Sequence, residues 1–176
     1  MGKKLKIAVS GRSGCGNTTI SKMVADRLGL VFINFTFRSI AQERGVDFKK
    51  ILKLAAKSDS IDKEVDTRQV KLAHEADGCV LGSRLAIWML KEADLKIYLR
   101  AKPETRAARI AKREDGDLDA VAAFTAERDR QDNTRYIRIY NIDNKNYDFA
   151  NLIIDTDDLT PDQIADLIIE AAEKIK

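Results

Sequence analysis

The chain has 176 residues, of which 44% are hydrophobic and 34% charged, enough for one compact domain and too few for two ordinary ones. Its net charge of +3 suits nucleic-acid binders and enzymes for anionic metabolites alike, and its two cysteines exclude a disulfide-rich scaffold. No apolar run approaches the roughly 20 residues that cross a bilayer, and no signal peptide is recognisable, so we expect a cytoplasmic protein without a membrane partner.

Short apolar runs alternate with helical patterns along the chain. In chain order we expect a strand at 5–10, a helix at 18–28, a strand at 30–35, helices at 36–43, 47–57 and 60–76, a strand at 78–82, a short helix at 84–90, a strand at 95–99, helices at 103–113 and 117–140, a strand at 152–154 and a last helix. The last helix is signalled by Thr160, Pro161 and Gln163, which are typical of a capped first turn. Continuous apolar strands between helices predict a doubly wound α/β fold, a parallel sheet covered on both faces.

The segment GRSGCGNTT at residues 11–19 follows the first predicted strand and opens the first predicted helix. Its glycines have the spacing of a phosphate-binding loop, in which backbone N–H groups and the helix N-terminus surround phosphate oxygens. The Thr18 hydroxyl is suited to ligating the Mg²⁺ that bridges the phosphates. We therefore expect ATP to be held by Gly11, Ser13, Gly14, Cys15, Gly16, Asn17, Thr18 and Thr19. The alternative is a glycine-rich turn with no ligand.

One position of this loop departs from the motif, because Asn17 stands where a lysine is expected. The loop therefore lacks a full positive charge beside the β- and γ-phosphates. We expect binding to survive, with the charge supplied by Arg12 or by an arginine from elsewhere in the chain. Cys15 lies among the loop amides, which predicts a lowered thiol pKa and a possible redox switch; the alternative is a small residue that only lines the loop.

Two groups of arginines accompany this loop. Arg38 and Arg84 follow the second and third predicted strands, and ligands of a doubly wound sheet bind beyond the carboxyl ends of its strands. The second group lies in the charged stretch and comprises Arg109, Arg113, Arg128 and Arg135, with Asp132 on the same helical face as the last two. Such a charged face is commonly just solvated, but beside a phosphate loop it also fits a cationic lid that excludes water.

The segments that carry a family resemblance occur in one order over nearly the whole chain: GRSGCGNTT, FRSIAQERG, IDKEVDTRQVKLA, LGSRLAIWMLKEADLKIYLRA, RIAKRE and TRYIRIYNID. They resemble a short cytidylate kinase, the compact type known from archaea. The resemblance implies a P-loop nucleoside monophosphate kinase fold in a single domain, 1–176. Its five-stranded parallel core would comprise 1–35, 77–112 and 150–176, with acceptor-binding helices at 36–76 and a helical lid at about 113–148.

The resemblance also implies roles for single residues. Arg38, Arg68 and Arg84 would grip the acceptor monophosphate, with Asp132 near its ribose or base. Arg109, Arg113, Arg128 and Arg135 would serve the lid. We further expect Arg109 to bind the donor nucleotide, and Arg12, Arg113, Arg128 and Arg135 to be the catalytic cations that supply the charge Asn17 lacks. The run Ile33–Asn34–Phe35 differs from the family pattern; Phe35 and Phe37 either flank the acceptor base or pack in the core.

The expected reaction is in-line transfer of the ATP γ-phosphoryl group to CMP or dCMP, with Mg²⁺ and without a general base, because the acceptor phosphate is already largely ionised at pH 7. A nucleotide-binding regulatory protein that has lost chemistry through Asn17 is one alternative, and another small-molecule or nucleoside monophosphate kinase is a second. We expect small-molecule nucleotides as partners, a monomer, and no nucleic acid, since no basic face interleaved with aromatic residues is visible.

Overall fold

A computed structural model describes residues 4–175 of the chain. Its centre is a five-stranded parallel sheet in the order β2-β3-β1-β4-β5. The strands are β1 (Lys6–Gly11), β2 (Val31–Ile33), β3 (Cys79–Gly82), β4 (Leu95–Arg100) and β5 (Leu152–Asp155). The predicted doubly wound parallel sheet is confirmed. Because β1 lies between β3 and β4, the strand order reverses at the end of β1, which is where such sheets bind ligands.

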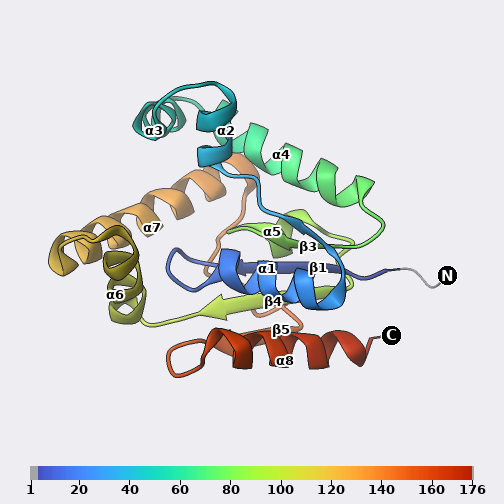
Figure 1. The fold of residues 1–176 in the computed structure, drawn as a ribbon. Coiled ribbons are helices and arrows are strands. Elements are labelled where there is room, and N and C mark those ends of the chain that lie inside the picture. The colour runs from blue at the N-terminus through green and yellow to red at the C-terminus, as the bar shows by residue number, and fades with distance from the viewer. Residues whose placement is uncertain (1–3, 176) are drawn as a thin grey trace.

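Alternating residues of β1 pack against two different layers. Ile7 and Val9 face the helices α1 (Asn17–Leu28) and α8 (Pro161–Glu173), which lie side by side on one face of the sheet (Figure 1). Ala8 belongs to a separate cluster on the opposite face, together with residues of α4 (Ser60–Glu75) and α5 (Ala86–Met89). Both faces are thus buried, which explains why the strands read as continuous apolar runs.

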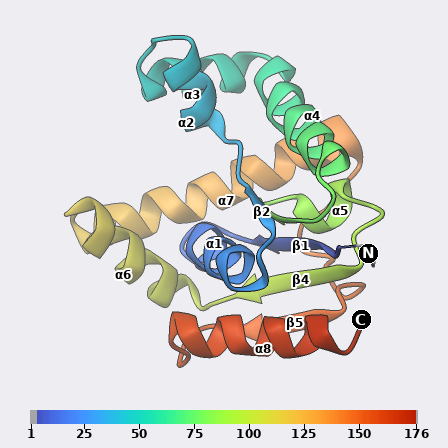
Figure 2. The same cartoon turned by 45° about the vertical axis from the view of Figure 1, so that its right-hand side comes forward.

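Two pairs of helices extend beyond the sheet. The helices α2 (Phe37–Glu43) and α3 (Phe48–Lys57) form with α4 a third apolar cluster that stands apart from the strands (Figures 1 and 2). The helices α6 (Pro103–Glu114) and α7 (Leu118–Tyr140) pack against each other, and α6 begins just past the end of β4 (Figure 2). The crevice above β1 therefore lies between these two helical groups.

The helix bounds agree with prediction to within two residues, and capping side chains fix some of the helix starts. Thr160 and Gln163 form the expected reciprocal capping box at α8, and Asp117 caps α7 by accepting from the Ala120 N–H at 2.8 Å. The second strand is shorter than predicted, 31–33 rather than 30–35, because Thr36 already caps α2. Among residues 4–175 no helix is long and apolar enough to cross a membrane.

Candidate active site

The loop between β1 and α1 has the backbone that an anion-binding nest needs. Gly14 and Gly16 have positive φ angles of 84° and 97°, and a Cβ at Gly11 would lie 2.5 Å from the Leu99 carbonyl oxygen. Gly16 is the N-cap of α1, and no side chain caps the helix there. The first-turn N–H groups of α1 are therefore left for an anion, and the helix dipole favours that charge.

Asn17 bridges the two ends of the loop. Its Nδ2 donates to the Gly11 carbonyl oxygen at 2.6 Å, while its Oδ1 is buried without a hydrogen-bond partner in the described part of the chain. An amide in this position closes the loop but brings no charge to a phosphate. The charge has to come from other side chains.

Three arginines reach the loop from outside it. Arg84 donates to the Ser13 hydroxyl, Arg106 donates to the Ser13 carbonyl oxygen at 3.0 Å, and Arg109 donates to the Gly14 carbonyl oxygen at 3.3 Å. Arg109 is also held by the hydroxyl and the carbonyl of Thr156, which follows β5. The expectation that guanidinium groups from elsewhere surround the loop agrees with this geometry.

One cavity of ≈ 820 Å³ extends from the loop to α4. Of the predicted site residues, those that line it are Gly11, Arg12, Ser13, Gly14, Cys15, Gly16, Asn17, Thr18, Thr19, Arg38, Arg84, Arg109, Arg113 and Arg128. Sequence segments far apart in the chain thus meet at one site, beyond the end of β1, as expected for this sheet topology.

Asp132 and Arg135 lie behind the cavity wall and hold its cations. The Asp132 carboxylate is buried, 2.9 Å from Arg84 Nη1, 2.7 Å from Arg135 Nη2 and 4.0 Å from Arg128 Nε. Arg135 also lies 3.3 Å from Asp62 of α4. The acid on α7 therefore organises guanidinium groups from three positions in the chain.

The arginines of this cluster differ in how well they are neutralised. Burial lowers the pKa of Arg128 to about 10, and the neighbouring Arg84 guanidinium acts in the same direction. Burial is the largest influence on Arg84 and works against its charged form, but Asp132, Tyr136 and Asp129 together outweigh burial and raise the Arg84 pKa. Arg128 thus remains a cation at neutral pH, and its positive charge is not fully neutralised by nearby carboxylates. It is therefore suited to binding the phosphate of a ligand.

Arg68 is not brought into this cavity. Its partly exposed guanidinium is ion-paired with Glu43 and lies 4.8 Å from the centre of the ring of Phe35, which lines the cavity although Arg68 does not. Arg12 lines the cavity at one side only, and its charged partner is Asp129 at 3.9 Å. Of the two, only Arg12, which belongs to the loop, lines the cavity.

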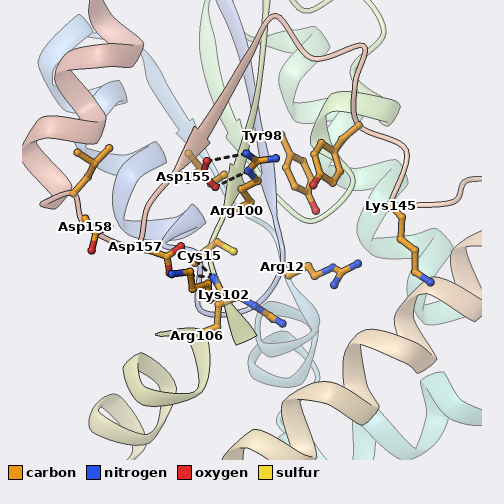
Figure 3. A pocket seen from close by; sticks show the side chains of 14 residues that line it. Arg12, Cys15, Tyr98, Arg100, Lys102, Arg106, Lys145, Asp155, Asp157 and Asp158 are labelled. Carbon is orange, nitrogen blue, oxygen red and sulfur yellow. Dashed lines mark hydrogen bonds and ion pairs between the residues drawn. The ribbon is translucent and has the colours of Figure 1, made fainter. Parts of the chain in front are cut away.

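Arg12 also borders a second cavity of ≈ 780 Å³ on the other side of the loop. Figure 3 shows Arg12 extending from the loop toward Lys145. The rings of Tyr98 and Tyr147, which also line this cavity, are stacked with their centroids 3.8 Å apart. Arg100 and Asp155 pair with each other in the same view. Arg12 therefore borders both cavities, whereas Arg84 donates a hydrogen bond to the loop residue Ser13.

The prediction of a lowered Cys15 pKa is wrong. The side chain is 2% exposed, and burial raises the pKa of its thiol, with Arg106 only partly opposing that effect. A thiol buried in this way is a poor nucleophile and a poor redox sensor. Cys15 is a small side chain in the packed wall between the loop and the sheet.

Thr18 is exposed at the start of α1, and its Oγ1 accepts a hydrogen bond from Asn34 Nδ2 at 2.9 Å. In residues 4–175 no group of three or more His, Cys, Asp or Glu side chains could hold a metal ion. A hydroxyl beside a phosphate nest fits Mg²⁺, which keeps several waters and binds largely through substrate phosphates.

Sequence reasoning missed Arg106 and the polar face of α4. Arg106 is 4% exposed and links the loop to Asp129 of α7, 2.7 Å away. Its signal was the spacing to Arg109, one turn later on α6. Asp62, Asp66 and Gln69 line the cavity from α4, and each is buried.

Residues 6–158 match the model of the cytidylate kinase-like family. The chain is 45% identical over 174 residues to cytidylate kinase 2 from Borreliella burgdorferi, covering 97% of this chain and 96% of that protein. It is 39% identical to cytidylate kinase from Pyrococcus horikoshii, covering 98% and 90% of the two chains. The chain belongs to the cytidylate kinase-like family. This cytidylate kinase-like protein is therefore a phosphotransferase that binds nucleotides.

Solved structures show the same fold at much lower identity. Shikimate kinase from Acinetobacter baumannii matches with a TM-score of 0.68 at 17% identity, covering 98% of this chain and 95% of that one. Deoxyadenosine kinase from M. mycoides matches with a TM-score of 0.63 at 19% identity, covering 96% and 100% of the two chains. These likenesses confirm the P-loop kinase fold of the cytidylate kinase-like chain, with its five-stranded parallel core.

Proposed function

We propose that the chain transfers the γ-phosphoryl group of ATP to CMP or dCMP. The observation that carries this proposal is the continuous cavity from the loop amides to α4, lined by Arg38, Arg84 and Arg128. A donor triphosphate fits the loop end, and a monophosphate fits between the arginines. The named relatives, which are cytidylate kinases, support the same acceptor.

The donor half of the site is built from backbone and from Arg109. The loop N–H groups cradle the phosphates, and Arg109 stands between the loop and Thr156. Mg²⁺ would be held by the Thr18 hydroxyl together with the phosphates, and it would neutralise the charge that develops during transfer. Asn34 donates to one lone pair of the Thr18 hydroxyl oxygen and so orients the hydroxyl, which leaves the other lone pair for a ligand.

In the acceptor half of the site, the phosphate of the acceptor would lie among arginine side chains, and no general base is needed. A phosphate monoester is mostly ionised at pH 7, so its oxygen attacks without losing a proton to the protein. Arg84 and Arg128, both anchored by Asp132, would hold the acceptor phosphate, and Arg113 would close over the transferring group. Asp132 is a positioning residue, because it does not line the cavity and acts through the arginines that it holds. Catalysis is then alignment and charge stabilisation.

The test is a coupled assay of ADP formation with CMP, dCMP, UMP and AMP as acceptors, in the presence of ATP and Mg²⁺. We expect kcat/KM for CMP or dCMP to exceed that for UMP and AMP by at least about tenfold. A preference for UMP, AMP or a non-nucleotide acceptor would overturn the proposal in favour of another small-molecule kinase.

A regulatory nucleotide-binding protein is the second candidate, favoured by the single observation that Asn17 binds Gly11 and carries no charge. Calorimetry with ATP and with CMP separates the two functions. Binding of both nucleotides with turnover supports the kinase, whereas binding without turnover by any acceptor supports the regulatory protein.

A further inference from the structure

The helix α4 turns one polar face toward the acceptor half of the cavity. Asp62, Asp66 and Gln69 stand at i, i+4 and i+7, and their exposed fractions are only 3%, 8% and 3%. Gln69 Oε1 is buried and accepts no hydrogen bond within residues 4–175, whereas Asp62 Oδ2 is ion-paired with Arg135. Nearly all buried polar atoms of native proteins are hydrogen-bonded, so an unpartnered amide oxygen at a cavity wall points to a ligand with N–H groups.

Aromatic rings stand beside this polar face. Phe35, Phe37 and Phe48 line the same cavity, with Val65 of α4 among them. The Phe48 ring is covered by the Arg38 guanidinium, 4.2 Å from its centroid. Flat apolar walls next to a polar edge are the environment in which proteins hold a planar heterocycle. The cavity thus offers a place for the base of the acceptor, as well as for its phosphate.

The two carboxylates of this face are not equivalent. Asp62 is engaged by Arg135 of α7, whose Nε lies 3.3 Å from its Oδ2. Asp66 accepts one hydrogen bond, from the Tyr140 hydroxyl at 2.8 Å, and is otherwise without a hydrogen-bond or ion-pair partner in the described chain. Asp66 therefore keeps the capacity to accept a further hydrogen bond from a ligand.

We propose that Asp66 and Gln69 select cytosine over uracil as the base of the acceptor, with Asp66 accepting from the exocyclic amino group. This inference rests on the proposed function. Cytosine presents an N4 amino donor where uracil presents the O4 acceptor, and a carboxylate accepts from the first but repels the second. Gln69 Oε1 can accept from the same edge of the base. The polar face of α4 is then the specificity-determining element.

Ionisation of Asp66 tunes this selection. Burial raises its pKa to about 7, the Tyr140 hydroxyl opposes this, Asp62 adds to it, and Arg135 opposes it weakly. The groups that face Asp66 are Tyr136, Tyr140 and Arg135 from α7 and Asp62 from α4, and Arg38 lines the cavity from α2. A protonated carboxyl can donate to uracil O4, whereas the ionised form cannot. Discrimination should therefore increase as pH rises through about 7.

The experiment measures kcat/KM for CMP and UMP at about pH 6 and about pH 8.5, on the full chain with saturating ATP and Mg²⁺. The acceptor phosphate titrates alike in both nucleotides, so its contribution cancels in the ratio. We expect the CMP-to-UMP ratio to rise by about fivefold or more between the two pH values. In Asp66→Asn, whose amide can donate to O4, the ratio should fall at least about tenfold and lose its pH dependence.

Two further variants separate a recognition role from a structural one. Glu75→Gln removes an exposed carboxylate from the end of the same helix and should leave the ratio unchanged. Tyr140→Phe removes the donor to Asp66, which should move the pH midpoint of the ratio upward while the folded state is retained. A folding defect would lower the rates for CMP and UMP together and would leave both the ratio and its midpoint in place.

The outcomes distinguish this inference from the function on which it rests. If wild type does not phosphorylate CMP, the proposed function fails. If wild type is active on CMP but Asp66→Asn, folded as judged by circular dichroism, keeps the ratio within about twofold, the assignment of Asp66 is overturned. A wild-type ratio that stays constant across the pH range, with Tyr140→Phe also unchanged, overturns it as well.

Discussion

The side-chain amide of Asn17 donates to the backbone carbonyl of Gly11 across 2.6 Å, so the first residue of α1 is tied to the last residue of β1. A Cβ on Gly11 would lie 2.6 Å from Asn17 Oδ1, so the two positions are sterically matched. This contact occupies the position from which a lysine would reach the phosphates. It holds the loop in shape while leaving the charge to be supplied by arginines that line the cavity, such as Arg84 and Arg109.

The first prediction concerns that charge. Asn17→Lys should raise kcat by about tenfold with little change in the KM for ATP, because an ammonium near the γ-phosphate stabilises charge that grows during transfer. Asn17→Met, of similar length without charge, is the matched control and should not raise kcat. Steady-state kinetics with CMP measure both. A Lys variant slower than wild type would show that the bridge to Gly11 matters more than the added charge.

The second prediction concerns the buried carboxylate of α7. Asp132→Asn leaves Arg84, Arg128 and Arg135 without their shared anion, so the free energy of unfolding should fall by about 3 kcal/mol. Urea denaturation without nucleotide measures the change. Glu127→Gln on the same helix breaks an exposed ion pair with Arg130 and should leave the free energy of unfolding nearly unchanged. Equal losses in the two variants would contradict the role given to Asp132.

The fold was predictable because its signals are local. Thr160, Pro161 and Gln163 are neighbours in sequence, and the apolar runs of the strands need only a sheet buried on both faces. The site was predictable where motif spacing or strand ends fix a residue, as for the loop glycines and Arg84. Arg68 shows the limit of that reasoning, because its guanidinium is ion-paired with Glu43 on α2 and does not line the cavity.

Long-range partners explain what the sequence could not reveal. Asp66 meets Tyr140, 74 positions further along the chain, and Arg106 meets Ser13 from 93 positions away. Only the packing of α7 and α6 decides that these side chains are buried. For Cys15 the amide nest was visible in the sequence, but the burial that outweighs it and raises its pKa was not.

The third prediction follows from the raised pKa of Asp66. The folded state binds this proton up to about pH 7, whereas the unfolded chain releases it near pH 3.8, so this group lowers the free energy of unfolding as pH rises between the two values. Asp66→Asn should therefore be more stable than wild type above pH 7, by about 2–4 kcal/mol, and the difference should shrink toward pH 4. Urea denaturation at several pH values measures it. Asp119→Asn, exposed in the first turn of α7, should show no such pH dependence.

The fourth prediction concerns the link between the glycine-rich loop and the helical pair. Arg106 donates to the Ser13 carbonyl oxygen and to Asp129 of α7, and its side chain is only 4% exposed. Arg106→Met keeps much of the apolar stem but leaves the Asp129 carboxylate, 14% exposed, with Arg12 alone at 3.9 Å. We expect the free energy of unfolding to fall by about 3 kcal/mol.

The same change should weaken ATP binding by about tenfold, because the loop carbonyl loses its anchor and Arg12 is drawn further toward Asp129. Calorimetry with an ATP analogue that is not hydrolysed measures the affinity, and urea denaturation measures the stability. Arg130→Met, which removes an exposed guanidinium from α7, is the matched control and should leave both the affinity and the stability nearly unchanged. If Arg106→Met loses stability but binds the analogue as tightly as wild type, Arg106 supports the packing of α7 and has no part in shaping the phosphate nest.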